Sequence, residues 1–163
     1  MIAIPLKAES VVFRPETFFI GHTVGGGVVR DPFLRIARRF HVETRGYRDG
    51  PYGAIKLDET YAYDTGEVDA FQWVITPAGT GRYVLAEASA GSGIVAQEER
   101  GELIFAYRRA LGPARGLAKP RFGVRMGLIG GETLLKSVRV GLLGAPLGSM
   151  TAFHRRTGPT PGA

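Results

Sequence analysis

The feature that most constrains the fold is an alternation of apolar and polar residues in segments of strand length. In residues 55–63, Ile55, Leu57 and Tyr61 share one parity, whereas Lys56 and Asp58 share the other. This period of two is typical of a strand with one buried face. The pattern recurs in segments bounded by glycine-containing turns, namely 70–76, 82–88, 94–97, 102–108, 121–128, 133–143 and 149–155.

Composition supports short strands joined by tight turns. The 163-residue chain contains 24 glycines, about twice the usual share of roughly 7 %. Strands spaced by roughly 8–12 residues, with no helical segments between them, are typical of an antiparallel sandwich or barrel. We therefore predict an all-β protein with a single domain over residues 1–156. The glycine- and proline-containing end, 157–163, is predicted to be a disordered tail.

Two segments allow more than one interpretation. Asp31-Pro32 could begin a helix, with Phe33, Ile36 and Phe40 at helical spacing. Residues 40–44 alternate like a strand, and we favour a strand over 36–46. The run at residues 25–27 is three glycines without the context of a phosphate-binding loop, so we predict a bend or bulge in a strand.

Several classes of site lack their sequence signature. The chain has no cysteine, which excludes disulfides, cysteine-based metal sites and a thiol nucleophile. No serine-hydrolase or nucleotide-binding glycine motif occurs. His22, His41 and His154 form no metal-binding motif, although a single histidine could still bind haem or act as a base. We predict no cofactor and no metal site. With no secretory or membrane-spanning segment recognised, we expect a soluble, cytoplasmic protein.

Charge is distributed unevenly along the chain. Residues 1–81 carry 9 Lys/Arg and 10 Asp/Glu, whereas residues 108–163 carry 10 Lys/Arg and the single acid Glu132. The basic half is interpreted either as a solvated face or as a site for an anionic group. Nucleic acid is the third alternative, but aromatic residues are not interleaved with the cations as stacking requires. We expect no nucleic-acid partner.

The order of motifs resembles an uncharacterised bacterial family of lipocalin-like (calycin) barrel proteins, many of which are lipoproteins. The match covers about residues 16–156. The residues that carry it are Phe19-x-Gly21, Arg39-Phe40-x-Val42 with Gly46, Leu57-Asp58-Glu59-x-Tyr61-x-Tyr63-Asp64-x-Gly66, Trp73, Gly81-Arg82-Tyr83, Ala88–Gly91, Gly93 and Tyr107. The resemblance implies an antiparallel lipocalin-like β-barrel that holds a small molecule.

The chain departs from that family at charged positions. Where members carry two acids and a tryptophan before a Met-x-Leu-Ile segment, this chain has Gly123, Val124 and Arg125. Lys136-Ser137 replaces an Asn-Arg pair, and no lipoprotein cysteine is present. If these positions line the barrel mouth, the protein should prefer an anionic ligand group and should not be tethered to a membrane.

Glu59 is the strongest candidate for chemistry. Its parity places the carboxyl on the apolar face, where desolvation raises the pKa unless a cation or donors compensate. A carboxyl tuned in this way can act as a general acid or base, with Tyr61 as a second catalytic candidate. The alternative is a structural ion pair or a hydrogen bond to a tyrosine.

The candidate ligand-binding residues are aromatic side chains for the walls and arginines for an anionic end. They are Tyr63, Trp73, Tyr83, Tyr107, Arg125 and Arg139. We predict a barrel that binds a small, largely apolar molecule with an anionic or phenolic group. The alternatives are a cofactor-independent isomerase, cyclase, dehydratase or lyase that uses Glu59, and a filled barrel with a structural role.

Overall fold

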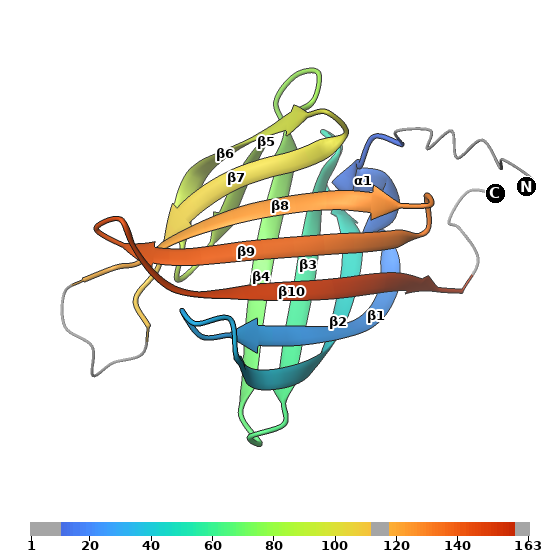
Figure 1. The fold of residues 1–163 in the computed structure, drawn as a ribbon. Coiled ribbons are helices and arrows are strands. Elements are labelled where there is room, and N and C mark those ends of the chain that lie inside the picture. Colours follow the sequence, from blue (N-terminus) through green and yellow to red (C-terminus); the bar gives the residue numbers. More distant parts are fainter. Residues whose placement is uncertain (1–10, 112–117, 159–163) are drawn as a thin grey trace, which may run out of the picture.

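The computed structural model describes residues 11–111 and 118–158. Within these residues ten strands form one closed antiparallel barrel, preceded by a short helix (Figure 1). The elements are α1 (Pro15–Phe18), β1 (Gly21–Arg30), β2 (Ile36–Asp49), β3 (Ala54–Tyr63), β4 (Val68–Pro77), β5 (Arg82–Glu87), β6 (Gly91–Glu99), β7 (Glu102–Arg108), β8 (Arg121–Ile129), β9 (Thr133–Leu142) and β10 (Ala145–Thr157).

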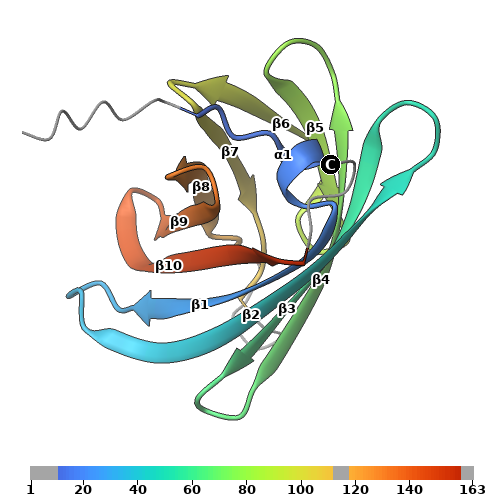
Figure 2. The same ribbon diagram turned by 90° about the vertical axis from the view of Figure 1, so that its right-hand side faces the viewer.

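Every strand pairs with the next strand in the chain, and β1 pairs with β10 to close the barrel. Because consecutive strands run in opposite directions, the connections alternate between the two ends of the barrel. The β1–β2, β3–β4, β5–β6, β7–β8 and β9–β10 connections lie at what we call the mouth end. The other connections and α1 lie at the closed end, which Figure 2 views.

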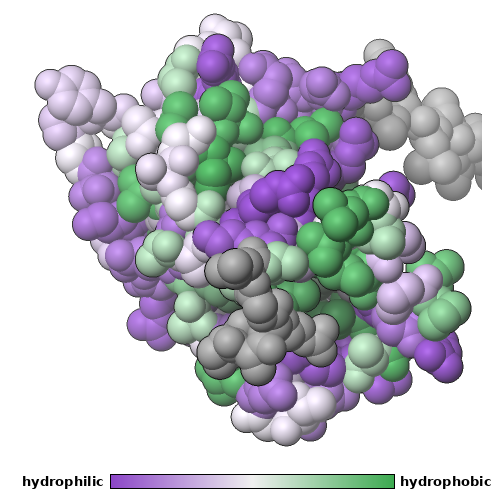
Figure 3. All heavy atoms as spheres, turned by 90° about the vertical axis from the view of Figure 1, so that its left-hand side faces the viewer, coloured by the Kyte–Doolittle hydropathy of each residue, from purple (hydrophilic) through white to green (hydrophobic). Residues whose placement is uncertain are grey.

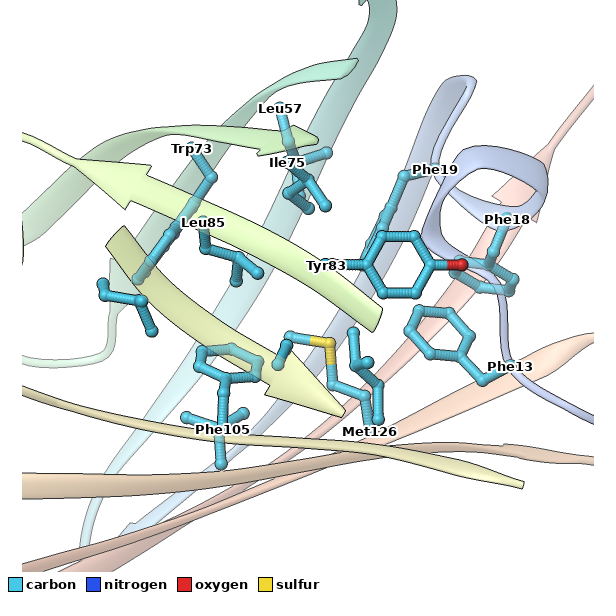
Figure 4. Packing of buried hydrophobic residues seen from close by; sticks show 14 of the residues in the cluster. Phe13, Phe18, Phe19, Leu57, Trp73, Ile75, Tyr83, Leu85, Phe105 and Met126 are labelled. Carbon is cyan, nitrogen blue, oxygen red and sulfur yellow. The ribbon is translucent and has the colours of Figure 1, made fainter. Parts of the chain in front are cut away.

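Aromatic residues fill the closed end. Phe13, Phe18 and Phe19 are buried and pack edge to face, with ring centroids 5.3–5.8 Å apart. Tyr83 on β5 packs beside them (Figure 4). Its hydroxyl donates to the carboxylate of Glu16 in α1, 2.8 and 3.0 Å from the two oxygens. Buried aromatic side chains contribute strongly to core stability. They make this half of the barrel a packed core.

The alternation observed in the sequence predicts the strands well. The strand expected over 36–46 is confirmed and continues to Asp49. The inward positions of β3, namely Ile55, Leu57, Glu59 and Tyr61, are all buried. Thr157, assigned to the tail from the sequence, is instead the last residue of β10, and its hydroxyl lies 2.8 Å from Nδ1 of His22. Gly158 follows the strand, and the remaining residues of the predicted tail, 159–163, lie outside the described residues.

The glycine run in β1 allows two strands to approach closely. The sequence predicted a bend or bulge at this run, but the strand is regular there. Pairing with β10 is regular through Gly25, Gly26 and Gly27, and the register shift of β1 falls later, between Val29 and Arg30. A Cβ on Gly25 would stand only 1.6 Å from the carbonyl oxygen of Phe153. Glycine is required here because the backbones of β1 and β10 meet where the barrel closes.

Replacing Gly25 by alanine should therefore weaken barrel closure. The new methyl group must displace the β10 backbone, and we expect a loss of about 3 kcal/mol in the free energy of unfolding, measured with urea. Gly127→Ala is the matched control, because its Cβ would meet only the side chain of Glu102. That control should stay within about 1 kcal/mol of the wild type. Equal losses in the two variants would contradict the steric argument.

Candidate functional site

The mouth half of the barrel contains a cavity of about 260 Å³. Its walls come from the inward positions of β3, β4, β7, β8, β9 and β10. The aromatic members of the wall are Tyr61, Tyr63, Phe71, Trp73, Tyr107 and Phe122. The charged members of the lining are Glu59 and Lys136 at the inner end, and Arg30, Arg38, Asp69 and Arg109 near the opening, where Asp69 accepts a hydrogen bond from Tyr63. A cavity of this size, with aromatic walls and charged groups at its ends, is suited to one small molecule.

Contacts between the rings fix the walls. Tyr107 and Phe122 stack in parallel, with centroids 5.1 Å apart, and Trp73 packs edge to face on Tyr107 at 5.4 Å. On the opposite wall, Phe40 packs edge to face on Tyr61 at 5.2 Å. Such aromatic pairs contribute stability in addition to that gained from burying their surface. The aromatic surface is therefore held in place before any ligand enters.

Arginines frame the opening of the cavity. The guanidinium of Arg109 lies over the rings of Phe71 and Phe122, 4.3 and 4.9 Å from their centroids. Arg38 lies 4.0 Å over Tyr63 and bonds Glu67 at 2.8 Å. Among the described residues, Arg109 has no acidic partner. Figure 3 views this end, where hydrophilic side chains lie beside a group of apolar ones.

A buried ion pair spans the barrel at the inner end of the cavity. Nζ of Lys136 on β9 lies 3.0 and 3.1 Å from the carboxylate oxygens of Glu59 on β3, and 2.9 Å from the hydroxyl of Tyr61. Strands β2, β1 and β10 separate β3 from β9, so the pair crosses the interior. Lys136 is 6 % exposed and Glu59 is 3 % exposed. We call these three residues the cross-barrel cluster.

The cluster sets the ionisation of its members. Burial disfavours the Glu59 carboxylate, but the charge of Lys136 and hydrogen bonds from Lys136 and Tyr61 outweigh it, so the pKa of Glu59 lies below its ordinary value. Burial and the adjacent Glu59 carboxylate raise the pKa of Tyr61 well above its ordinary value. Glu59 is therefore an ionised partner of a cation. The ion pair predicted from the sequence as the alternative is present, and a catalytic role of Glu59 stays a prediction.

His154 lies beside the cluster on the inner face of β10. It pairs across the strands with Leu134, and Lys136 pairs with Ala152, so Lys136 and His154 are diagonal neighbours. The histidine is fully buried, and neither ring nitrogen has a hydrogen-bond partner among the described residues. Burial lowers the pKa of His154 to about 4. The ring is therefore neutral near pH 7.

The structure brings five of the eight sequence candidates to the cavity. These are Glu59, Tyr61, Tyr63, Trp73 and Tyr107. Each belongs to the inward parity of its strand, so alternation alone was enough to find them. Their roles in binding or catalysis stay predictions.

The other three candidates lie elsewhere. Tyr83 packs against the closed end and bonds Glu16. Arg125 is on the outer wall, where it pairs with Glu102 at 3.1 Å, because Val124 and Met126 take the inward positions of β8. Arg139 also points outward, since its neighbour Val138 faces the interior. The arginines that line the opening of the cavity are Arg30, Arg38 and Arg109 instead.

Comparison with known proteins identifies the family. The sequence matches the model of a family described as "Protein of unknown function (DUF3833)" over residues 5–156. The chain belongs to the DUF3833 family. A comparison with curated proteins finds no match.

Solved structures share the fold of this DUF3833 chain. It is similar to the S-type phycobiliprotein lyase CPES from Guillardia theta, with a TM-score of 0.60 and 7 % identity over 86 % of this chain and 89 % of that one. Rv2717c from M. tuberculosis has a TM-score of 0.61 and 16 % identity over 90 % and 99 % of the two chains. The predicted all-β, lipocalin-like antiparallel barrel is confirmed.

Other sites are not found in the described part of this DUF3833 chain. His22 bonds Glu43 at 2.6 Å and His41 is exposed, while His154 is buried apart from both. No group of three potential metal ligands comes together in residues 11–111 and 118–158. The described helix is too short to cross a membrane.

The cross-barrel cluster should show strong coupling in a double-mutant cycle. Glu59→Gln and Lys136→Met each leave a buried charge without its partner, and we expect each to lower the free energy of unfolding by roughly 3–5 kcal/mol. The double variant removes both charges and should recover most of that loss. Urea unfolding at pH 7 measures all four proteins. Additive losses would contradict a direct pair.

His154 should make stability fall in mild acid. Its folded pKa of about 4 lies below the ordinary histidine value of 6.5, so the unfolded chain binds the proton first. The stabilisation is complete above pH 6.5 and is lost as pH falls toward 4, by about 3 kcal/mol. His154→Leu should remove most of this decline in urea unfolding, whereas His41→Gln on the exposed face should not. Parallel pH profiles for all three proteins would refute the assignment.

Proposed function

We propose that the barrel binds one small amphipathic molecule with an aromatic or otherwise apolar body and an anionic group. The observation that carries the proposal is the cavity of about 260 Å³, with aromatic walls and an opening framed by arginines. Apolar walls favour removal of an apolar body from water, and their rigidity reduces the ordering required on binding.

The arginines determine where the anionic group would lie. Arg109 borders the cavity, is half-buried and has no acidic partner among the described residues. Its guanidinium is also held over Phe71 and Phe122. A guanidinium fixed in this way offers paired donors to a carboxylate, sulfonate or phosphate. The anion would therefore lie at the opening, with the apolar body directed inward.

The inner end of the cavity offers a second polar contact. The cross-barrel cluster presents the Tyr61 hydroxyl and the Lys136 ammonium beside apolar walls. Because Glu59 already pairs with Lys136, this end suits a hydroxyl or carbonyl more than a second charge. The ligand would be polar at both ends and apolar between them. The structural likeness to CPES and Rv2717c supports the barrel on which this proposal is built.

Binding of a matched pair of probes tests the charge preference. We expect 2-naphthoate to bind at least fivefold more tightly than the neutral 2-naphthamide in isothermal titration calorimetry. Arg109→Ala should lower the affinity for 2-naphthoate at least tenfold and should change the affinity for 2-naphthamide by no more than about twofold. Arg48→Ala, an exposed arginine at the closed end, is the control and should change neither. Equal affinity for the two probes would refute the anion site.

Native mass spectrometry of freshly purified protein addresses the natural ligand. A stoichiometric adduct that is lost on denaturation would support tight binding and would give the mass of the occupant. We expect its composition to include an acidic group. A neutral, non-ionisable adduct in the cavity would contradict the proposed anion contact.

Catalysis is the second candidate, favoured by the position of Glu59 and Tyr61 in the cavity wall. The two groups could move a proton of a bound molecule in an isomerase, cyclase, dehydratase or lyase reaction. The lowered pKa of Glu59 makes it a poor proton donor and a weak base near pH 7. CPES is a phycobiliprotein lyase, but it is only 7 % identical to this chain, so the likeness supports a shared fold and does not support a shared reaction. We therefore favour binding.

The Glu59→Gln/Lys136→Met variant separates the two candidates once an occupant is known. It removes the carboxylate without leaving a buried charge unpaired, so the barrel should remain folded. For a binding protein the variant should lose only the contact of the ligand with Lys136, so the ligand should bind more weakly but still occupy the cavity. Loss of most turnover, with the occupant still bound, would support the enzyme and contradict a pure carrier.

A further inference from the structure

The mouth end carries a second hollow beside the ligand cavity. This groove has a volume of about 760 Å³ and runs over β8, β9 and β10 and beside the β1–β2 loop. It shares wall residues of β9 and β10 with the cavity, but its arginines are different ones. Its wall includes Arg108, Arg121 and Arg139, and leucines stand at its edges, Leu34 in the β1–β2 loop and Leu143 in the β9–β10 turn. We call these five residues the rim.

The rim arginines are gathered on one face, and the acid that lines the groove with them, Asp31, is paired with Arg35. Arg108 and Arg121 are direct cross-strand partners, and Arg139 pairs with Gly123, two positions along β8 from Arg121. Among the described residues none of the three forms an ion pair, although Arg108 bonds the carbonyl of Lys119. Like charges placed directly opposite one another destabilise a sheet. An external anion would relieve this repulsion.

The two rim leucines are also unfavourable in a barrel that has no binding partner, because of their exposure and their backbone conformation. Leu34 is 69 % exposed and Leu143 is 97 % exposed. Both adopt left-handed backbone conformations, with φ of 64° and 50°. That region favours glycine and asparagine over leucine. Two turn positions where asparagine would be both more stable and more soluble therefore hold large apolar side chains. Phe33, 78 % exposed beside Leu34, extends the same apolar edge.

We propose that the rim docks the mouth end on a membrane surface that contains anionic phospholipid. The arginines would contact headgroup phosphates, and the leucines with Phe33 would enter the boundary between headgroups and acyl chains. Cations held beside exposed apolar side chains are the combination that binds such a surface peripherally. The cavity opens at the same end, so a docked barrel would present its opening to the lipid.

This inference goes beyond the proposed ligand site and does not depend on it. The rim arginines point outward, whereas Arg38 and Arg109 belong to the cavity. A barrel that binds no naphthoate could still dock on vesicles, and a barrel that does not dock could still bind naphthoate. The probe titration and the vesicle experiment below therefore fail independently.

Vesicle sedimentation with the full chain tests the proposal. We expect binding to vesicles of 70 % phosphatidylcholine and 30 % phosphatidylglycerol, and at least tenfold weaker binding to pure phosphatidylcholine. Raising NaCl from 0.1 to 0.5 M should weaken the binding, because salt screens the rim charges. Absence of sedimentation with the anionic vesicles would overturn the proposal.

Matched variants locate the surface. Arg108→Gln/Arg121→Gln/Arg139→Gln should weaken vesicle binding at least tenfold. The control with the same net charge is Arg48→Gln/Arg82→Gln/Arg155→Gln, which changes exposed arginines at the closed end and should stay within about threefold of the wild type. Equal weakening by the two triple variants would overturn the rim as the docking surface, because it would show attraction by net charge alone.

The leucines provide a test that does not threaten the fold. Leu34→Asn/Leu143→Asn suits the left-handed backbone, so its melting temperature should equal or exceed that of the wild type. Its vesicle binding should still fall at least fivefold. Unchanged vesicle binding in this variant would overturn insertion of the leucines. If heparin binds as tightly as the vesicles, with no effect of this variant on either, the rim is a general polyanion surface and the membrane proposal fails.

Discussion

The ion pair between Lys136 and Glu59 is the interaction on which the interior of this barrel depends. Two charges removed from water are tolerated only when they satisfy one another with good geometry. Here the ammonium contacts both carboxylate oxygens and the Tyr61 hydroxyl within 3.1 Å. Because the pair joins strands that are not neighbours in the sheet, it ties opposite walls together across the interior. A barrel held in this way need not be filled with apolar side chains at that level.

The pair also marks a division of the barrel interior. Toward the closed end, Phe13, Phe18 and Phe19 complete a packed core around α1. Toward the mouth end, the aromatic side chains line the walls of a cavity. His154 shows how strongly this interior disfavours a further charge, since burial keeps its ring neutral. Among the described residues, the charged side chains that line the cavity lie at its two ends, in the cluster and at the opening, where Asp69 lies with the mouth arginines.

Much of the fold and part of the site could be predicted from sequence because both follow from alternation. The parity of Ile55, Leu57 and Glu59 places the carboxylate inside, and the structure agrees. Parity cannot say which inward residue faces Glu59 across the barrel, since that depends on strand number and closure. The sequence therefore leaves Lys136 among the cations expected at the mouth, and it expects Tyr83 in the cavity, whereas Tyr83 packs at the closed end and donates to Glu16. Alternation along β8 and β9 does predict that Arg125 and Arg139 face outward, because Val124, Met126 and Val138 take the inward positions.

The same alternation allows one strand to serve two surfaces. Arg108 ends β7 and lines the outer groove, whereas the next residue, Arg109, borders the cavity. On β9, Lys136 faces inward and Arg139 faces outward. A net positive charge in the second half of the chain thus becomes two separate positive sites, divided by the thickness of the barrel wall. The two sites share wall residues of β9 and β10, such as Val138 and Met150, but no arginine belongs to both. Substitution of the groove arginines therefore changes the charge of the outer groove and leaves the cavity arginines in place.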